Sequence, residues 1–372
     1  MLLLAWRNLT HSRTRLWVSA GGVGLALTLV LALDAIVNGV EHQLAAYIER
    51  SGAEVWVAQP GVRNLHMVAS TLPAGVAAEV AAVAGVAAVT PLLYTSQNVQ
   101  MGRDNRFSYV FGLPPGAAMG GPWRVAAGKT LPGPGEAVVD ARQARDSGVG
   151  LGDGVRIFGR RFRVAGLSEG SSSLTNGVVF VAQADFARLR RTKGSLSYLL
   201  VRVAPGQSPE AVARRIEDGV RVSALSTREF ARQERKVVGD MGADAIRLMN
   251  LMAFLIGLSV LALSVYTATL SRRTEFGVLK AVGAGSAQLV GTVLAQALYS
   301  VAAGLLLAGA VSFLVLPLVL PWLGFDLPLQ PTLASVLKVA LAALGIGGLA
   351  AVIPVIQIAG LDPAAVFRGG ER

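Results

Sequence analysis

Four long stretches without a charged side chain constrain this chain more than any other feature. They cover residues 16–33, 248–271, 281–325 and 339–361. A helix needs about 20 apolar residues to cross a bilayer, and buried helices of soluble proteins seldom stay uncharged for so long. The mean hydropathy of +0.53 agrees with a membrane protein. We therefore predict membrane-spanning helices over residues 16–40, 247–270, 287–316 and 334–358.

The first stretch has a second interpretation, a cleaved signal peptide. Its 18 uncharged residues exceed the apolar region of about 7–15 residues in such peptides. The sequence Leu33-Asp34-Ala35 that follows also lacks the small residues of a cleavage site. We therefore expect the first helix to be retained.

Basic residues in short loops indicate the orientation. They lie before the first predicted span and between the second and third, at Arg7, Arg13, Arg15, Arg272, Arg273 and Lys280. The loop between the third and fourth spans holds one charged residue, Asp326. Because short basic loops stay in the cytoplasm, we expect residues 1–15, 271–286 and 359–372 to be cytoplasmic and 41–246 to lie outside the cell.

The segment 41–246 has the mixed pattern of an α/β domain. Residues 54–58 alternate like a strand, and Gly and Pro cluster near residues 114–122, where we place a break between two lobes. We predict a first lobe over about 53–113, a second over about 120–225 and a stalk helix over 226–246. The fold class is therefore an α+β membrane protein, with four spans arranged 1 + 3 and an extracytoplasmic α/β domain inserted between the first and second.

The stalk helix has a clear start signal. Ser226 and Glu229 form a capping-box pattern, in which each side chain would accept a backbone N–H of the other residue. No proline follows before Leu270, so the helix would be about 65 Å long, against about 30 Å for the bilayer core. The first span similarly continues to Gly52. We expect both helices to couple the outer domain to the membrane.

Signatures of chemistry are missing from the sequence. The chain has no cysteine, which excludes disulfides, thiol catalysis and Cys-ligated zinc, and His11, His42 and His66 lack metal-ligand spacing. We expect His66 and Met67 to lie in a solvated loop. Gly128-Lys129-Thr130 lacks the earlier glycine of a phosphate-binding loop, because position 123 is Trp. We predict no catalytic residue and no metal site.

Two further patterns have structural interpretations. The net charge is +11, but no basic cluster alternates with aromatic residues, so we expect no nucleic-acid partner. Gly345, Gly347 and Ala350 match a dinucleotide-binding pattern within an apolar span, where small residues that allow close helix packing are the better explanation.

The segment 271–286 has the pattern of a short amphipathic helix. Residues 275–282 form about two turns, Gly283 and Gly285 end them, and Ser286 is placed to cap the third span. Phe276, Leu279 and Val282 share one side, and the polar edge carries Arg272, Arg273, Glu275 and Lys280. Such a helix suits docking to a cytoplasmic partner; the alternative is an interfacial loop that only obeys the charge rule.

These features resemble the permease superfamily of the macrolide exporter MacB and the cell-division protein FtsX, the type VII ABC fold. The resemblance rests on the 1 + 3 topology, on Ala5–Leu9, on the run Arg272–Ala284 and on the tail Leu361–Arg368. The run matches the coupling-helix motif of the family. The resemblance therefore assigns contact with an ATPase to Arg272, Arg273, Glu275, Phe276, Gly277, Leu279, Lys280, Gly283 and Ala284.

The resemblance also implies partners and a location. It implies a homodimer in the bacterial cytoplasmic (inner) membrane, bound to two copies of an ABC ATPase that holds ATP and Mg²⁺, with no cofactor in this chain and a periplasmic adaptor as a further partner. ATPase dimerisation would push the coupling helices, which is the mechanotransmission mechanism. Because the chain begins at its first span, we expect a separate ATPase polypeptide, as for DevC-type and haem-exporter permeases.

Several functions fit this resemblance. The leading hypothesis is export of a hydrophobic or amphipathic compound. The alternatives are an FtsX-like relay that activates a cell-wall hydrolase outside the cell, a lipoprotein-release permease and a membrane-anchored enzyme. We predict no charged cavity of substrate size within the spans and assign no substrate-binding residue. Asp34 and Arg247 lie at similar depth and form a predicted pair, unless Asp34 simply lies at the interface.

Overall fold

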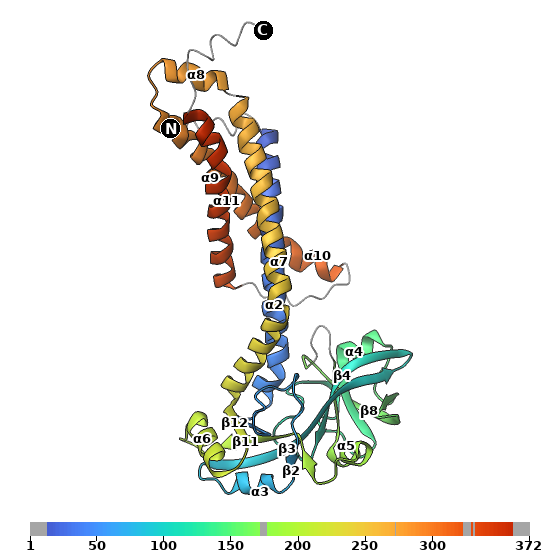
Figure 1. Cartoon of the computed structure of the whole chain (residues 1–372). Coiled ribbons are helices and arrows are strands. Elements are labelled where there is room, and N and C mark those ends of the chain that lie inside the picture. The colour runs from blue at the N-terminus through green and yellow to red at the C-terminus, as the bar shows by residue number, and fades with distance from the viewer. Residues whose placement is uncertain (1–12, 172–176, 272, 323–328, 330–331, 360–372) are drawn as a thin grey trace. The chain divides into compact units, whose positions relative to one another are not determined.

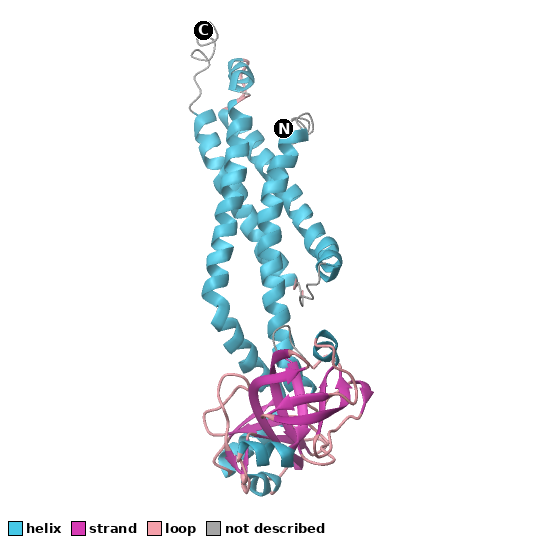
Figure 2. Ribbon diagram, turned by 90° about the vertical axis from the view of Figure 1, so that its right-hand side faces the viewer, coloured by secondary structure: helices cyan, strands magenta, loops and turns pink. Residues whose placement is uncertain are grey.

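The computed structural model describes residues 13–171, 177–271, 273–322, 329 and 332–359. Its described residues divide into two compact units. The helical unit comprises residues up to 39 and from 242 onward, and the sheet unit comprises residues 40–241. Two long helices, α2 (Arg13–Arg50) and α7 (Thr227–Leu270), contribute residues to both units. Figure 2 shows the strands gathered in the sheet unit.

Within the described residues, four helical segments are long and apolar enough to cross a membrane, and the first of them continues into the sheet unit. They are Ala20–Arg50, Arg247–Leu270, Ser286–Leu320 and Leu333–Gln357. The first two belong to α2 and α7. The third comprises α9 (Ser286–Ala310), a π-helical turn η1 (Val311–Val315) and α10 (Leu316–Trp322), and the fourth is α11 (Leu333–Ala359) (Figure 1). The expected class, an α+β membrane protein, is confirmed.

The third helical segment continues past its predicted end at residue 316. Pro317 is the second residue after η1 and has no N–H to donate to the carbonyl of Phe313, four residues earlier. A widened π turn accommodates such an interruption. The chain therefore stays helical through η1 and α10 to Trp322 instead of stopping near the proline.

Small residues let the helices of this unit approach closely. A Cβ added to Gly304 on α9 would lie 3.2 Å from the backbone nitrogen of Gly24 on α2. On α11, a Cβ added to Gly347 would lie 3.1 Å from a methyl of Val301, whereas Gly345 faces open space. The close-packing interpretation therefore holds for Gly347 but not for Gly345.

The sheet unit holds twelve strands within the described residues. They are β1 (Val55–Ala58), β2 (Leu72–Pro73), β3 (Val86–Met101), β4 (Asp104–Leu113), β5 (Val125–Gly128), β6 (Glu136–Asp140), β7 (Gly154–Ile157), β8 (Arg160–Ser168), β9 (Gly177–Ala182), β10 (Ser195–Leu196), β11 (Tyr198–Val203) and β12 (Ser223–Ser226). The helices that accompany them are α3 (Val76–Ala81), α4 (Ala141–Asp146), α5 (Gln183–Arg190) and α6 (Pro209–Gly219).

Ten strands form one sheet in the order β12-β1-β11-β3-β4-β9-β6-β8-β5. The tenth, β7, pairs with both β3 and β8, so β3, β4, β9, β6, β8 and β7 close into a ring. The first half of β3 pairs with β11 and its second half with β4. One 16-residue strand thus belongs to both halves of the sheet.

The sheet differs from the predicted division into lobes over 53–113 and 120–225. One half combines β1 with β11 and β12 from the other end of the domain, and the ring runs from the middle of β3 to β9. The reason is that β11 and β12 return to pair antiparallel beside β1, and local sequence patterns do not specify such distant pairing. Residues 170–177 are polar and Ser-rich, a composition that predicts a loop, and residues 172–176 lie outside the described part of the chain.

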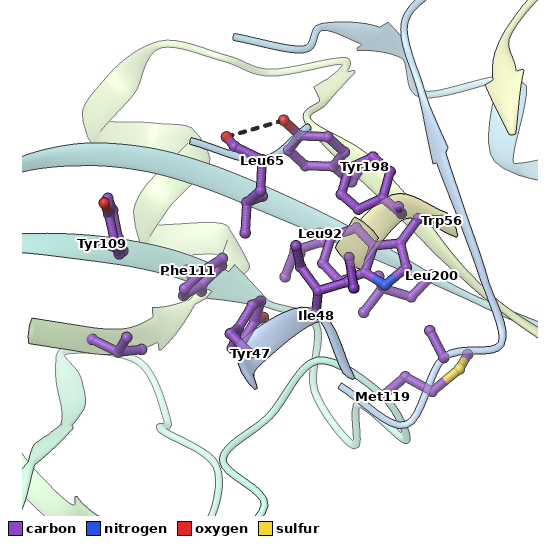
Figure 3. Packing of buried hydrophobic residues seen from close by; sticks show 14 of the residues in the cluster. Tyr47, Ile48, Trp56, Leu65, Leu92, Tyr109, Phe111, Met119, Tyr198 and Leu200 are labelled. Carbon is purple, nitrogen blue, oxygen red and sulfur yellow. Dashed lines mark hydrogen bonds between the residues drawn. The ribbon is translucent and has the colours of Figure 1, made fainter. Parts of the chain in front are cut away.

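The core of the sheet unit combines one sheet face with the ends of α2 and α7 (Figure 3). The ring of Tyr47 on α2 stacks on Phe111 with centroids 4.0 Å apart, and its hydroxyl donates to the carbonyl of Gly120 at 2.7 Å. Trp56 on β1 stacks on Phe230 of α7, with centroids 5.1 Å apart. Both long helices are therefore anchored in this core.

The start of α7 differs in part from the predicted capping box. The Ser226 hydroxyl accepts the N–H of Glu229 at 3.4 Å, as expected. The Glu229 carboxylate instead accepts from Gln233 at 2.9 Å and pairs with Arg232. Ser226 is the last residue of β12, where it pairs with Val55. The reciprocal bond is therefore replaced by contacts along the helix.

Candidate functional site

The predicted coupling segment forms a short helix, α8 (Arg273–Ala281), between α7 and α9 (Figure 1). Its end is a Schellman motif: the N–H of Ala284 donates to the carbonyl of Leu279 at 2.9 Å, and that of Gly283 to Lys280 at 3.2 Å. Gly283 has a φ of 103°, a backbone conformation that residues with a side chain rarely adopt. This glycine therefore fixes where the helix stops.

The cap of α9 differs from the prediction. Gly285, with φ −67° and ψ 147°, occupies the N-cap position, and its carbonyl accepts the N–H of Gln288 at 2.9 Å. Ser286 is already the first helical residue, so its predicted capping role is wrong. The extended backbone at Gly285 lets α9 begin one residue earlier than the serine pattern indicated.

The apolar residues of α8 do not all share one side. Phe276 is 6% exposed and belongs to the core of the helical unit together with Leu289. Leu279 is 48% exposed and Val282 is 84% exposed. A helix turns by about 100° per residue, so residues spaced three apart shift steadily around it. Val282 also lies beyond the last residue of α8, Ala281. Phe276 therefore anchors α8, and the other two remain on the surface.

The remaining residues of the motif divide in the same way. Gly277 is buried, Ala284 packs against the core of the helical unit, Glu275 is exposed and Lys280 is half-buried. Arg272 lies outside the described residues, and only the backbone of Arg273 is described. The outward side of α8 thus presents Glu275, Val278 and Leu279, a mixed apolar and charged surface.

The predicted pair of Asp34 and Arg247 does not form. Arg247 is exposed and pairs with Asp244, three residues earlier on α7, at 3.0 Å. Asp34 accepts hydrogen bonds from Asn38 at 3.2 Å and from the hydroxyl of Ser335 on α11. Arg247 thus pairs with a carboxylate of its own helix, and Asp34 links α2 to α11.

His66 is not in a solvated position, contrary to the prediction. Its side chain is 7% exposed, and its Nδ1 lies 2.6 Å from Oε1 of Glu234, which is fully buried on α7. No local pattern indicates this pair, because Glu234 lies among Arg232, Arg235 and other charged residues that resemble a solvated helix face. Only the fold brings His66 to that helix.

Three tyrosines lie close to this pair. The ring of Tyr109 packs against the His66 ring at a tilt of 45°, with centroids 4.2 Å apart. Burial and the nearby Glu234 carboxylate raise the pKa of Tyr109 to about 12. Burial, the largest cause, also raises the pKa of Tyr94 and Tyr198 well above the usual value. All three therefore stay protonated and neutral at physiological pH.

Family comparisons cover both units. Residues 16–218 match the family described as MacB-like periplasmic core domain, and residues 247–363 match the FtsX-like permease C-terminal family. The first match alone covers more than half of the chain. The two matches together cover most of the inserted sheet unit and the three helical segments that follow it.

Two named relatives align with this chain over nearly its full length. Two proteins of Mycobacterium tuberculosis, each described as an ABC transporter permease, are 24% identical over 379 residues and 27% identical over 374 residues. Each alignment covers 99% of this chain and all of the relative.

Two solved domains are also similar to this chain, each with 14% identity and a TM-score of 0.36. The periplasmic region of MacB from Actinobacillus actinomycetemcomitans covers 49% of this chain and 92% of its own. The extracellular domain of the transporter YknZ from Gram-positive bacteria covers 47% and 99%. On the strength of the two family matches, the chain belongs to the MacB/FtsX family of ABC transporter permeases.

Proposed function

We propose that this chain is the permease subunit of an ABC exporter for a hydrophobic or amphipathic compound, driven by a separate ATPase that docks on α8. The active assembly would be a permease homodimer with two ATPase copies, which bind the ATP and Mg²⁺. The observation that carries the proposal is the geometry of α8, which is anchored by Phe276 and capped by Gly283 while its outward side stays exposed.

The anchor explains how a push on α8 would reach the membrane helices. Phe276 packs in the same apolar cluster as Leu261 of α7 and Leu289 of α9. Dense side-chain packing transmits a displacement instead of absorbing it. Movement of α8 would therefore move α7, whose 44 residues continue without interruption into the sheet unit.

The other end of α7 is held equally well. Phe230, Ala231 and Glu234 are each at most 1% exposed, and they pack into the core of the sheet unit. Their spacing places them on one side of the helix. We propose that α8 and both termini are cytoplasmic, that the sheet unit lies outside the cell, and that α7 carries the motion between them.

Reconstitution tests this proposal. The full chain is placed in lipid vesicles with the ATPase that copurifies with it, and ATP hydrolysis and uptake of amphipathic dyes are measured. Glu275→Lys and Gly283→Pro should lower permease-stimulated hydrolysis at least about tenfold without blocking insertion. Ser286→Ala, next to the same helix, should behave as the parent.

The two measurements separate the parts of the proposal. Unchanged hydrolysis in the Glu275→Lys and Gly283→Pro variants would contradict docking at α8. Normal coupling without movement of any amphipathic compound would contradict export and favour a signalling relay. Hydrolysis of ATP by the chain alone would contradict the separate ATPase.

A further inference from the structure

A cavity of about 330 Å³ opens between α2, α7 and α11 of the helical unit. Its volume is at the lower end of the range of small-molecule sites, about 300–1,000 Å³. Its polar wall consists of Asp34, Asn250, Ser335 and Lys338. The sequence predicted no charged cavity of substrate size within the spans, so this cavity corrects that expectation.

Polarity changes along the depth of the cavity. Asp34 in the middle of α2 is hydrogen-bonded to Ser335 near the start of α11, and Asn250 of α7 belongs to the same polar wall. The apolar wall includes Ala26, Phe254 and Ile346. Ile346 lies eleven residues beyond Ser335 on α11, about 16 Å along the helix at 1.5 Å per residue. The cavity therefore matches a molecule with a polar head and an apolar tail.

The polar wall has unused hydrogen-bonding capacity. Both hydrogen bonds to Asp34, from Asn38 and Ser335, are accepted by Oδ2, so its Oδ1 remains available among the described residues. The buried Oδ1 of Asn250 has no hydrogen-bond partner within the same residues. The Asn250 acceptor thus lacks a donor, which is costly for a buried polar atom, and Oδ1 of Asp34 can accept a further hydrogen bond beside it.

Lys338 adds a positive charge to the same wall. It forms no salt bridge within the described part of the chain, and it lies one turn from Ser335 on α11. Ionisable residues inside membrane spans are rare and usually functional. A head that pairs an ammonium with an anionic group would complement Asp34 and Asn250 through the first charge and Lys338 through the second.

We propose that this cavity binds a single-chain zwitterionic amphiphile, with its primary ammonium donating to Asp34 and Asn250 and its anionic group beside Lys338. The apolar tail would lie against Leu27, Phe254 and Ile346. That this ligand is the cargo rests on the export function proposed above. The binding itself does not, and can be measured without the ATPase.

The test exploits the absence of cysteine from the chain. A single cysteine is introduced at Leu251, which lines the cavity, or at Met249, which does not line it, in the full-length protein. Each variant is placed in nanodiscs of phosphatidylcholine and phosphatidylglycerol, and its labelling by maleimide is timed. Lysophosphatidylethanolamine should slow labelling of Leu251→Cys at least about tenfold and leave Met249→Cys unchanged.

Two comparisons test the chemistry of the head. Lysophosphatidylcholine has the same chain but no N–H donor, and dodecylamine has the ammonium but no anion. Each should need at least about tenfold higher concentration for the same protection. Adding Asp34→Asn to Leu251→Cys should raise the half-protective concentration of lysophosphatidylethanolamine about tenfold, the usual size for a hydrogen bond to a charged group. Asn250→Ala provides the same test if Asp34→Asn fails to fold.

Three results would overturn the binding proposal. Equal protection by all three probes would show a merely apolar cavity, and equal protection of Met249→Cys would show a general effect on the bilayer. No protection would show that the amphiphile does not bind. Protection without stimulation of the partner ATPase would keep the site and contradict its role in export, whereas stimulation without protection would contradict only the site.

Discussion

The imidazole of His66 and the carboxylate of Glu234 form a buried pair, with Nδ1 and Oε1 2.6 Å apart. The other carboxylate oxygen accepts the backbone N–H of Leu65, also at 2.6 Å. Both partners lie in the sheet unit, His66 in the loop after β1 and Glu234 on α7. The pair therefore fastens this loop to a helix that begins more than 160 residues later in the sequence.

Replacing Glu234 by Ala should release that loop. Removing one partner of a buried pair costs about 3–5 kcal/mol, so amide exchange at residues 61–70 should accelerate at least about a hundredfold. Hydrogen exchange with mass spectrometry on the full chain measures this directly. Glu229→Ala, at a more exposed position of the same helix, is the control. Unchanged exchange at Leu65 would show that the pair does not hold the loop.

Acid should weaken the contact of Glu136 with its cationic neighbours. Hydrogen bonds from Lys129 at 2.9 Å, from the backbone of Gly133 and from Arg163 hold the pKa of Glu136 below its ordinary value of 4.5. A depressed pKa stabilises the folded state above the unfolded pKa, and this contribution disappears as the pH falls from about 4.5 through the folded pKa. Glu136→Gln should reduce the loss of thermal stability between pH 7 and pH 3. An identical pH dependence in parent and variant would contradict this prediction.

Phe276 and Leu279 should respond differently to truncation. Phe276→Ala opens a space in the core of the helical unit and should lower stability by about 3 kcal/mol, the usual cost of removing a buried Phe. Leu279→Ala should leave stability unchanged and weaken binding of the partner ATPase, because this side chain is 48% exposed. Thermal unfolding in detergent and ATPase pull-down separate the two effects. A stability loss in Leu279→Ala as large as that in Phe276→Ala would contradict the assignment of faces.

Gly304 and Gly309 provide a matched pair on α9. A Cβ on Gly304 would lie 2.9 Å from a methyl of Val23, whereas nothing lies within 4 Å of one on Gly309. Gly304→Leu should therefore separate α9 from α2 and lower the unfolding temperature by several degrees. Gly309→Leu should not. Equal effects would show that the close approach of α2 and α9 does not contribute to stability.

The fold class could be predicted from the sequence because membrane spans and strands have local signals. The charge-free runs mark the four helical segments, and the alternation predicted over residues 54–58 marks β1. The end of the coupling helix α8 also has a local signal, because Gly283 adopts a positive φ that other residues avoid.

The contacts that could not be predicted join residues far apart in the sequence. Asp34 meets Ser335, and His66 meets Glu234, through folds that no local pattern specifies. Arg247 was expected to pair with Asp34 across helices, but it pairs with Asp244, because residues three apart share a helix face. The cavity between α2, α7 and α11 likewise depends on three helices whose packing is set by the whole unit.

Strand β3 has a mechanical consequence for the sheet unit. Its 16 residues pair with β11 along one half and with β4 and β7 along the other. The ring and the remaining strands β11, β1 and β12, here called the open half, therefore cannot separate without breaking the backbone hydrogen bonds of β3. β12 pairs with β1 at the edge of the open half and leads directly into α7. Tension on that helix would be shared among many backbone hydrogen bonds at once, so the unit would respond as a single stiff body.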